Sequence, residues 1–349
     1  MRATDTNRRK FLRSAGAAAL GGTALQLLGP SVVLAAQDNT VSLQLNWIPS
    51  VDFAGFYIAD SLGYYKDEGV NVRFLPGGPN MQAVEQVLAG GMGTAGLPTF
   101  LTSTIQAIQR DAKLTVIGTV FQTSPLALIS LEDLPLRNAE DLRGKRIGAA
   151  QGRQRELNAV FRINNMPTDS YRFMPIGYDS APLVRGDVDV ISVYATSEPL
   201  VLAERGVKTN LILYADLGLH TYTCPIVVRT DAIQNNRDTL LRFLRASIKG
   251  WEMNAKDTAI APKLVVEKYA GSTKVELAHE LKVNEALTPF TQSDLTRKKG
   301  MLWLDKTHIS GPVYRGLTAA GESNLPDVDS YVDTSLLEEA FGDRTTLLS

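Results

Sequence analysis

The sequence predicts an α/β fold built on open, mainly parallel β-sheets. Segments in which apolar and polar residues alternate, as in β-strands, are each followed by a segment with apolar residues at helical spacing. Turns that contain proline and glycine separate these units, for example at 76–79. Regular alternation of strand and helix is typical of proteins in which helices pack on a mainly parallel sheet.

The first forty residues form a different kind of segment. A basic run at 8–13 that includes two consecutive arginines precedes an uncharged stretch at 14–28, which is too short to span a bilayer. Small residues that suit a signal peptidase follow. We therefore interpret residues 1–36 as a twin-arginine export signal, cleaved after Ala35 or Ala36. An uncleaved anchor or a disordered basic tail is the alternative.

The predicted elements follow one another in a regular order after this signal. Trp47 ends the first alternating strand, and helical spacing begins at Phe53. A polar connection with proline at 132–144 separates two groups of units, so a second lobe is expected to begin there. The predicted strands are 41–47, 70–74, 94–97, 114–121, 146–150, 172–176, 188–194, 211–214 and 226–228, and the predicted helices include 53–62, 81–88, 100–110, 199–206 and 239–251.

The charge balance argues against nucleic-acid binding. The chain has 36 Lys and Arg against 37 Asp and Glu, and residues 1–36 hold five of these basic residues and one acidic residue. The rest therefore carries a net charge of about −5 and lacks the clustered cations that bind nucleic acid. Cys224 is the single cysteine, which excludes an internal disulfide and a thiolate metal site. We expect no metal and no cofactor.

Recognised catalytic motifs are not evident. The glycines at 90–93 follow a helical pattern rather than a strand, so they do not form a dinucleotide-binding fingerprint. His279 and His308 are expected to be solvated in helical, charged surroundings, whereas His220, beside Tyr222, is a candidate for a cleft. We therefore expect no catalytic residue.

Aromatic residues lie where predicted strands end. Trp47 follows the first strand, Gln122 follows Phe121 at the end of another, and Tyr194 ends the central strand of the second group. Open α/β sheets bind ligands at the carboxyl ends of their strands, and aromatic side chains in a crevice can sandwich a flat ring. The pattern thus indicates a binding cleft for an aromatic ligand.

The helix after the first strand leaves two interpretations open. Phe53 and Tyr57 fit the core and the cleft equally well on their spacing alone. Phe56 and Phe243, in contrast, are expected in the hydrophobic core.

Several short runs of residues are distributed over most of the chain after the signal: 45–49, 53–59, 63–70, 139–148, 186–189, 197–199 and 243–251. They resemble the pyrimidine-precursor-binding family of ABC transporter proteins, which also contains the fungal thiamine-pyrimidine synthases. The resemblance implies the two-lobed periplasmic-binding fold of type II, with two hinge crossovers. Lobe one would hold residues 41–127 plus 226–349, and lobe two would hold 132–222.

The same resemblance implies a set of ligand-binding residues. Trp47 matches the family tryptophan that stacks on the ligand ring, and Glu198 matches the glutamate of a short Glu-Pro motif that accepts hydrogen bonds from ring or exocyclic nitrogens. Asn46 and Phe53 stand where many pyrimidine binders have aspartate and histidine. Both departures remove charge, which favours riboflavin or an unassigned ligand over formylaminopyrimidine. The candidate ligand-binding residues are Asn46, Trp47, Phe53, Tyr57, Gln122, Tyr194, Glu198 and Tyr222.

The function that the resemblance implies is binding without catalysis. A monomeric protein on the extracytoplasmic face, or in a periplasm, would capture a thiamine pyrimidine precursor or a riboflavin-like heterocycle and deliver it to an ABC permease in the membrane. One alternative is an enzyme like the fungal synthases, whose chemistry uses a histidine and a cysteine cluster. Phe53 and the lone Cys224 argue against it. A ligand sensor for a membrane receptor is a third hypothesis.

Overall fold

The structure is a computed structural model that describes residues 39–348 except 80, 272 and 274. The predicted export signal at 1–36 lies outside the described residues and stays a prediction. Among the helices of the described residues, none is long and apolar enough to cross a membrane.

The first of two five-stranded sheets has the order β2-β1-β3-β10-β4. β1 pairs in parallel with β2 and β3, and β10 lies antiparallel between β3 and β4. β4 is buried at every residue, whereas β2 lies at the sheet edge and leaves residues exposed. The strands are β1 (Thr40–Gln44), β2 (Asn71–Leu75), β3 (Ala95–Gly96), β4 (Leu114–Phe121) and β10 (Thr223–Arg229).

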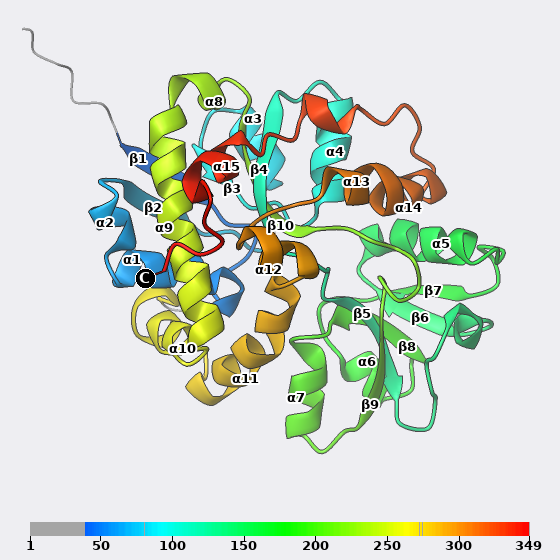
Figure 1. Cartoon of the computed structure of the whole chain (residues 1–349). Coiled ribbons are helices and arrows are strands. Elements are labelled where there is room, and N and C mark those ends of the chain that lie inside the picture. The colour runs from blue at the N-terminus through cyan, green and yellow to red at the C-terminus, as the bar shows by residue number, and fades with distance from the viewer. Residues whose placement is uncertain (1–38, 80, 272, 274, 349) are drawn as a thin grey trace, which may run out of the picture. The chain divides into compact units, whose positions relative to one another are not determined.

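The second sheet repeats this arrangement with the order β7-β6-β8-β5-β9. β6 pairs in parallel with β7 and β8, and β5 is antiparallel to β8 and β9. The strands are β5 (Leu126–Leu131), β6 (Arg146–Ala149), β7 (Arg172–Pro175), β8 (Val190–Tyr194) and β9 (Thr209–Leu213). Figure 1 shows both sheets.

The chain passes between the sheets twice, and each crossing supplies the antiparallel strand. β5 directly follows β4 but belongs to the second sheet, and β10 follows β9 but belongs to the first. The predicted α/β class with two mainly parallel sheets and two crossovers is therefore confirmed. The returning strand begins at Thr223, three residues before the predicted Ile226. The lobe boundaries themselves stay a prediction.

Helices flank both sheets, and short 3₁₀ or π segments join several of them. The longer elements agree with the predicted helices to within a few residues. The helices are α1 (Ala54–Ser61), α2 (Tyr64–Asp67), α3 (Val84–Ala89), α4 (Leu101–Gln109), α5 (Gln154–Ile163), α6 (Ala181–Val184), α7 (Glu198–Glu204), α8 (Ala232–Asn235), α9 (Arg237–Lys256), α10 (Ile260–Leu264), α11 (Leu277–Leu287), α12 (Asp294–Lys299), α13 (Lys306–His308), α14 (Tyr314–Ala319) and α15 (Ser335–Phe341). The short segments are η1 (Val51–Phe53), η2 (Ala139–Leu142), η3 (Gln151–Arg153), η4 (Val265–Tyr269), η5 (Thr288–Thr291), η6 (Ile309–Val313) and η7 (Val328–Ser330).

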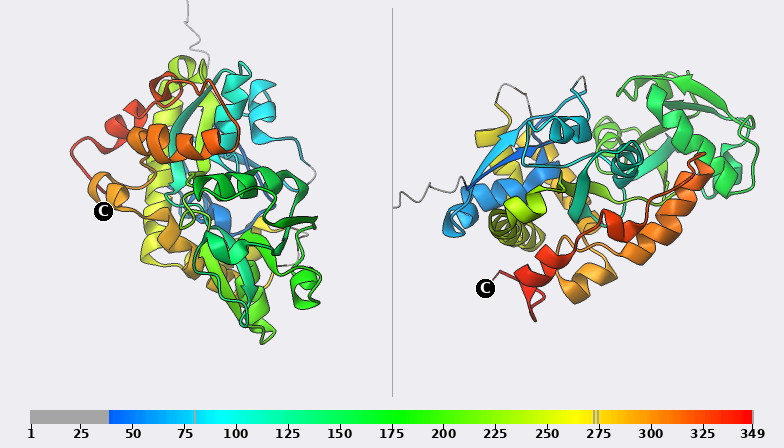
Figure 2. Two further views of the ribbon diagram at one scale, coloured as in Figure 1. Left: turned by 90° about the vertical axis from the view of Figure 1, so that its right-hand side faces the viewer. Right: turned by 90° about the horizontal axis from the view of Figure 1, so that it is seen from above.

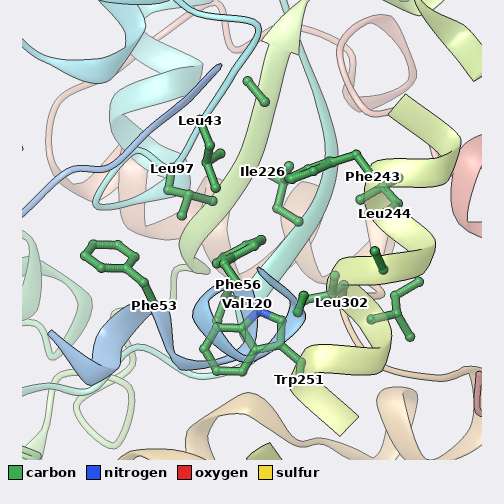
Figure 3. Packing of buried hydrophobic residues seen from close by; sticks show 14 of the residues in the cluster. Leu43, Phe53, Phe56, Leu97, Val120, Ile226, Phe243, Leu244, Trp251 and Leu302 are labelled. Atoms are coloured by element: carbon green, nitrogen blue, oxygen red, sulfur yellow. The ribbon is translucent and has the colours of Figure 1, made fainter. Parts of the chain in front are cut away.

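The largest hydrophobic cluster packs α1 and α9 against the first sheet (Figures 1, 2 and 3). Phe56 of α1 stacks on Phe243 of α9, with ring centroids 6.2 Å apart, and both side chains are fully buried as predicted. The two helices approach closely at Gly250, where a Cβ atom would lie 1.9 Å from the carbonyl oxygen of Gly55. Only glycine fits this crossing, so α9 holds α1, and the loop before it, in a fixed position.

Candidate ligand-binding site

A cavity of about 410 Å³ is lined by residues of both sheets and of the loops at their strand ends. This volume lies in the range of about 300 to 1,000 Å³ that is usual for small-molecule sites. The side chains that give it chemical character are Asn46, Trp47, Asp52, Phe121, Arg153, Tyr178, Tyr194, Glu198, Cys224, His279 and Glu280. The carboxyl ends of strands thus meet at the cavity, as expected for an open α/β protein.

Trp47 reaches the cavity from the segment after β1 and contacts Tyr178 there. The two ring centroids are 5.4 Å apart, and the ring planes are inclined by 63°. The backbone of Trp47 is held because Gly77 donates its N–H to the Trp47 carbonyl at 3.0 Å. A Cβ atom on Gly77 would lie 2.6 Å from the Trp47 nitrogen. The glycine of the predicted turn at 76–79 therefore allows this close approach.

Tyr178 was not among the predicted ligand-binding residues. It follows β7 as Trp47 follows β1, and 70 % of its surface is exposed despite its size. The signal was present in the sequence, since an aromatic residue after a strand was the pattern that identified Trp47.

Asn46 lies beside Trp47 and is anchored on the protein. Its amide nitrogen donates to the hydroxyl of Thr99 at 3.2 Å and to the sulfur of Cys224 at 3.7 Å. Cys224 has a left-handed backbone with φ of 50°, which is unusual for a residue with a side chain. Such strained positions concentrate at functional sites. Burial raises the pKa of the Cys224 thiol, so the thiol stays protonated at neutral pH.

Tyr194 and Glu198 line the cavity from the second sheet. Tyr194 ends β8, and its backbone N–H donates to Oε2 of Glu198 at 3.2 Å. Burial raises the pKa of Glu198, and the charge of Asp52 raises it further, while hydrogen bonds from backbone N–H groups oppose both effects. This carboxyl is therefore a strong acceptor that lacks full solvation.

Asp52 and Glu280 add two carboxyl groups that the sequence analysis did not identify. Glu280 is 6 % exposed, and its Oε2 accepts the backbone N–H of Val51 at 3.1 Å. Burial raises the pKa of Asp52, and the hydroxyl of Ser50, which donates to it at 3.0 Å, opposes this. No local pattern marks Glu280, because α11 reaches the cavity only through the tertiary fold.

The structure places the other four predicted residues away from the cavity lining. Phe53 is fully buried in the core (Figure 3), and Tyr57 is fully buried against Tyr269, with ring centroids 4.0 Å apart. Gln122 donates to the carbonyl of Trp303 at 2.8 Å. Tyr222 accepts the backbone N–H of Asp305 at 2.9 Å and lies in a different hydrophobic cluster. Packing thus holds Phe53 and Tyr57, and internal hydrogen bonds hold Gln122 and Tyr222, whereas the buried hydroxyl of Tyr57 has no hydrogen-bond partner among the described residues.

The histidines differ from expectation. His279 lines the cavity and has its Nδ1 atom 3.6 Å from a carboxylate oxygen of Glu204, so it is not merely solvated. His308 is partly buried, with its ring centroid 5.4 Å from that of His220. Burial lowers the pKa of both His220 and His308. His220 lines a second cavity of about 50 Å³, too small for a heterocycle.

A metal is not suggested by the arrangement of these groups. Among the described residues, no group of three or more His, Cys, Asp or Glu side chains is placed to hold an ion.

The fold is that of the periplasmic solute-binding proteins. The chain is similar to a putative periplasmic sulfonate-binding protein of an ABC transporter from Methylobacillus flagellatus, with a TM-score of 0.62 and 14 % identity over 86 % of this chain and 93 % of that one. The sulfonate-binding protein from Escherichia coli gives a TM-score of 0.62 and 13 % identity over 85 % and 98 %. At these identities the likeness shows the fold.

The chain belongs to the NMT1/THI5-like family, whose model matches residues 50–259. It is 29 % identical to the riboflavin-binding protein RibY of Chloroflexus aurantiacus, over 76 % of each chain. It is 24 % identical to the formylaminopyrimidine-binding protein of Halalkalibacterium halodurans, over 61 % of this chain and 66 % of that one. A 4-amino-5-hydroxymethyl-2-methylpyrimidine phosphate synthase from Aspergillus parasiticus is 24 % identical over 59 % and 64 %. The family predicted from the sequence runs is confirmed.

Proposed function

We propose that this chain is the extracytoplasmic solute-binding component of an ABC importer, and that its ligand is a small aromatic heterocycle of the riboflavin or thiamine-pyrimidine type. The observation that carries the proposal is the pairing of Trp47 with Tyr178 at a cavity that also contains Glu198. Aromatic faces bind a flat ring, and a carboxylate accepts hydrogen bonds from its nitrogens.

The binding-protein function is supported by the fold, the family and the most extensive of the three relatives described above. That relative is named for riboflavin binding and covers 76 % of this chain. Riboflavin is also the larger and less polar of the two ring systems. Uncharged Asn46 at the cavity and uncharged Phe53 behind it favour that ring over formylaminopyrimidine.

Ligand capture would proceed by closure of two lobes. The segments that connect the sheets, 122–125 and 214–222, are short and are the natural hinges. Because Trp47 follows a strand of the first sheet and Glu198 begins a helix beside the second, closure would bring both onto the same ring. The closed monomer would then dock on the membrane permease.

The enzyme alternative has less support from the residues. Relatives named as synthases exist. The cavity of this chain, however, offers one cysteine, Cys224, and burial keeps its thiol protonated. The cavity lining includes His279, which is placed beside Glu204 on α7. A sensor for a membrane receptor would share the same cavity, and the genes adjacent to this one distinguish it from an importer component.

The decisive experiment is mass spectrometry of the small molecule that co-purifies with the mature protein. Titration of the ligand-free protein with riboflavin, hydroxymethylpyrimidine and formylaminopyrimidine, followed by tryptophan fluorescence, then ranks the ligand classes. We expect riboflavin to bind most tightly and to leave the protein unchanged chemically. Conversion of the ligand during incubation, or binding of none of the three, would contradict the proposal.

A further inference from the structure

Three carboxyl groups from separate elements face the same cavity. Asp52 lies in η1, Glu198 begins α7 and Glu280 lies in α11. Burial raises the pKa of each, and the charge of Asp52 raises the pKa of both Glu198 and Glu280. The charge of Asp52 thus acts on both glutamates, and the protein leaves all three carboxyl groups poorly solvated.

The cations at the cavity are engaged elsewhere. Arg153 has its guanidinium carbon 4.5 Å from the centroid of the Phe100 ring and its Nη1 atom 3.9 Å from a carboxylate oxygen of Glu156. The Nδ1 atom of His279 faces Glu204, and a charge on His279 would also lower the pKa of Glu280, although the two side chains form no ion pair. None of the ion pairs found among the described residues joins a cation to Asp52, Glu198 or Glu280. Among the described residues, these three carboxyl groups therefore line the cavity without an ion-pair partner of their own.

A second, independent observation points to a ligand at this wall. Thr223, at the start of β10, is 2 % exposed and lines the cavity. Its hydroxyl has no hydrogen-bond partner among the residues that the structure describes. A buried hydroxyl without a partner is costly, and the Thr223 hydroxyl would gain one if its side chain turned toward a ligand in the cavity.

We infer that the cavity selects an uncharged or cationic heterocycle that carries several hydrogen-bond donors, and rejects the phosphorylated form of the same molecule. This inference rests on the proposed function and names the substrate class of that site. Hydroxyl or amino donors would satisfy the acceptors of Asp52, Glu198 and Glu280 and relieve their mutual repulsion. A phosphate monoester instead brings about 1.5 to 2 negative charges at neutral pH into the same space.

If the cavity selects a donor-rich ligand, closure of the two lobes would also depend on that ligand. Without a donor-rich ligand, bringing Glu198 toward Asp52 and Glu280 increases the repulsion of like charges in a poorly solvated space. With such a ligand in place, the same approach completes its hydrogen bonds. An importer that transports only the dephosphorylated molecule would gain its selectivity from this difference.

The test uses riboflavin and riboflavin 5′-phosphate, which share one ring system and differ by the phosphate. Titration calorimetry of the mature protein should show that riboflavin binds at least about tenfold more tightly. The double variant Asp52→Asn, Glu280→Gln should reduce this ratio severalfold. Glu285→Gln, an exposed residue on the same helix as Glu280, should leave the ratio unchanged.

A measurement on the ligand-free protein distinguishes failure of the selectivity inference from failure of the proposed function. Asp52→Asn alone should raise the melting temperature of the empty protein, because it removes a charge that the fold solvates poorly. Equal binding of the two flavins, or a lower melting temperature of the Asp52→Asn variant, overturns the selectivity inference and leaves the binding function standing. If neither flavin binds, and hydroxymethylpyrimidine, its phosphate and formylaminopyrimidine also fail to bind, the proposed function and this inference fall together.

Discussion

Trp47 and Tyr178 meet edge to face at the cavity, with ring centroids 5.4 Å apart, although 130 positions of sequence separate them. Trp47 follows β1 of the first sheet and Tyr178 follows β7 of the second. The two rings are therefore carried by different sheets, and a ligand that contacts both would bridge the two sheets. If the two lobes close when a ligand binds, a change at Trp47 would therefore report that closure.

Trp47→Ala should weaken ligand binding strongly. Stacking of a base on an aromatic side chain is worth about 1 to 3 kcal/mol, which corresponds to roughly a five- to two-hundredfold loss of affinity. Tyr178→Ala should have a smaller effect, about twofold to tenfold, since an aromatic pair contributes about 0.5 to 1.5 kcal/mol beyond area burial. Fluorescence titration with the co-purified ligand measures both variants.

Trp303→Phe is the control for this titration. Trp303 lies outside the cavity lining, with the Nζ atom of Lys299 4.4 Å from its ring centroid. Affinity and most of the fluorescence change should survive its replacement. If Trp47→Ala binds as tightly as the parent protein, the stacking role of Trp47 is wrong.

The sheets and helices could be predicted because their signals are local. β4 is buried along eight consecutive residues, and α9 shows a helical period of burial over twenty. Pro-Gly turns mark the ends of other elements. The pairing of β10 with β4 is different, since the residues are about a hundred positions apart. Family resemblance, rather than periodicity, supplied that topology.

The site was predicted only in part, and the reason is physical. Trp47 and Tyr194 follow or end strands, so their place at the carboxyl ends of the strands could be inferred, whereas Asn46 and Glu198 were identified through the family resemblance. Phe53 and Tyr57 have the same aromatic character, but the close packing of α1 turns both into the core. Glu280 was missed because its position depends on the tertiary placement of α11, which no neighbouring residue encodes.

Gly250→Ala should destabilise the protein without a direct effect on the ligand. The added Cβ atom would lie 1.9 Å from the carbonyl oxygen of Gly55 and 3.0 Å from the Cβ atom of Ala59, so α9 and α1 must separate. Overpacking of this kind costs about 1 to 3 kcal/mol. Urea unfolding measures it, and Gly311→Ala, whose Cβ atom meets nothing within 4 Å, should be neutral or slightly stabilising. Equal effects of the two substitutions would contradict this account of the crossing.

Export should depend on the paired arginines rather than on positive charge alone. Replacing Arg8 and Arg9 by lysine keeps the charge of the segment and removes the twin-arginine feature. We expect unprocessed precursor to accumulate in the cytoplasm, as measured by fractionation and immunoblotting. Replacing Lys10 by arginine is the control and should leave processing normal. Normal processing of the double variant would show that the signal uses another route.

The stability of the ligand-free protein should fall as the pH rises above the ordinary carboxyl range. Burial raises the folded-state pKa of Asp52, Glu198 and Glu280 above their ordinary values of 3.8, 4.5 and 4.5. Below those values both states are protonated. Between the ordinary and the raised pKa the folded state retains protons that the unfolded state has released, so rising pH favours unfolding there. Urea unfolding at a series of pH values should show this decline, and Asp52→Asn should flatten it; an unchanged slope in the variant would refute the assignment to this group.

Glu198→Gln should reduce affinity more than stability. In the ligand-free protein the carboxyl of Glu198 is held by the backbone N–H of Tyr194 at 3.2 Å, and burial disfavours its charge, so a neutral amide of the same shape costs the fold little. A bound ring with N–H groups loses a charged acceptor, which is worth about 1.5 to 3 kcal/mol, or roughly ten- to hundredfold in affinity.

Calorimetric titration and thermal melting of the same preparation separate the two effects. The matched control is Glu339→Gln on α15, where the carboxylate lies 2.9 Å from the Nη2 atom of Arg237 on the protein surface; exposed pairs of this kind contribute little, so affinity should not change. A large loss of melting temperature in Glu198→Gln with unchanged affinity would make Glu198 a structural residue of α7 and would leave the aromatic pair to hold the ligand alone.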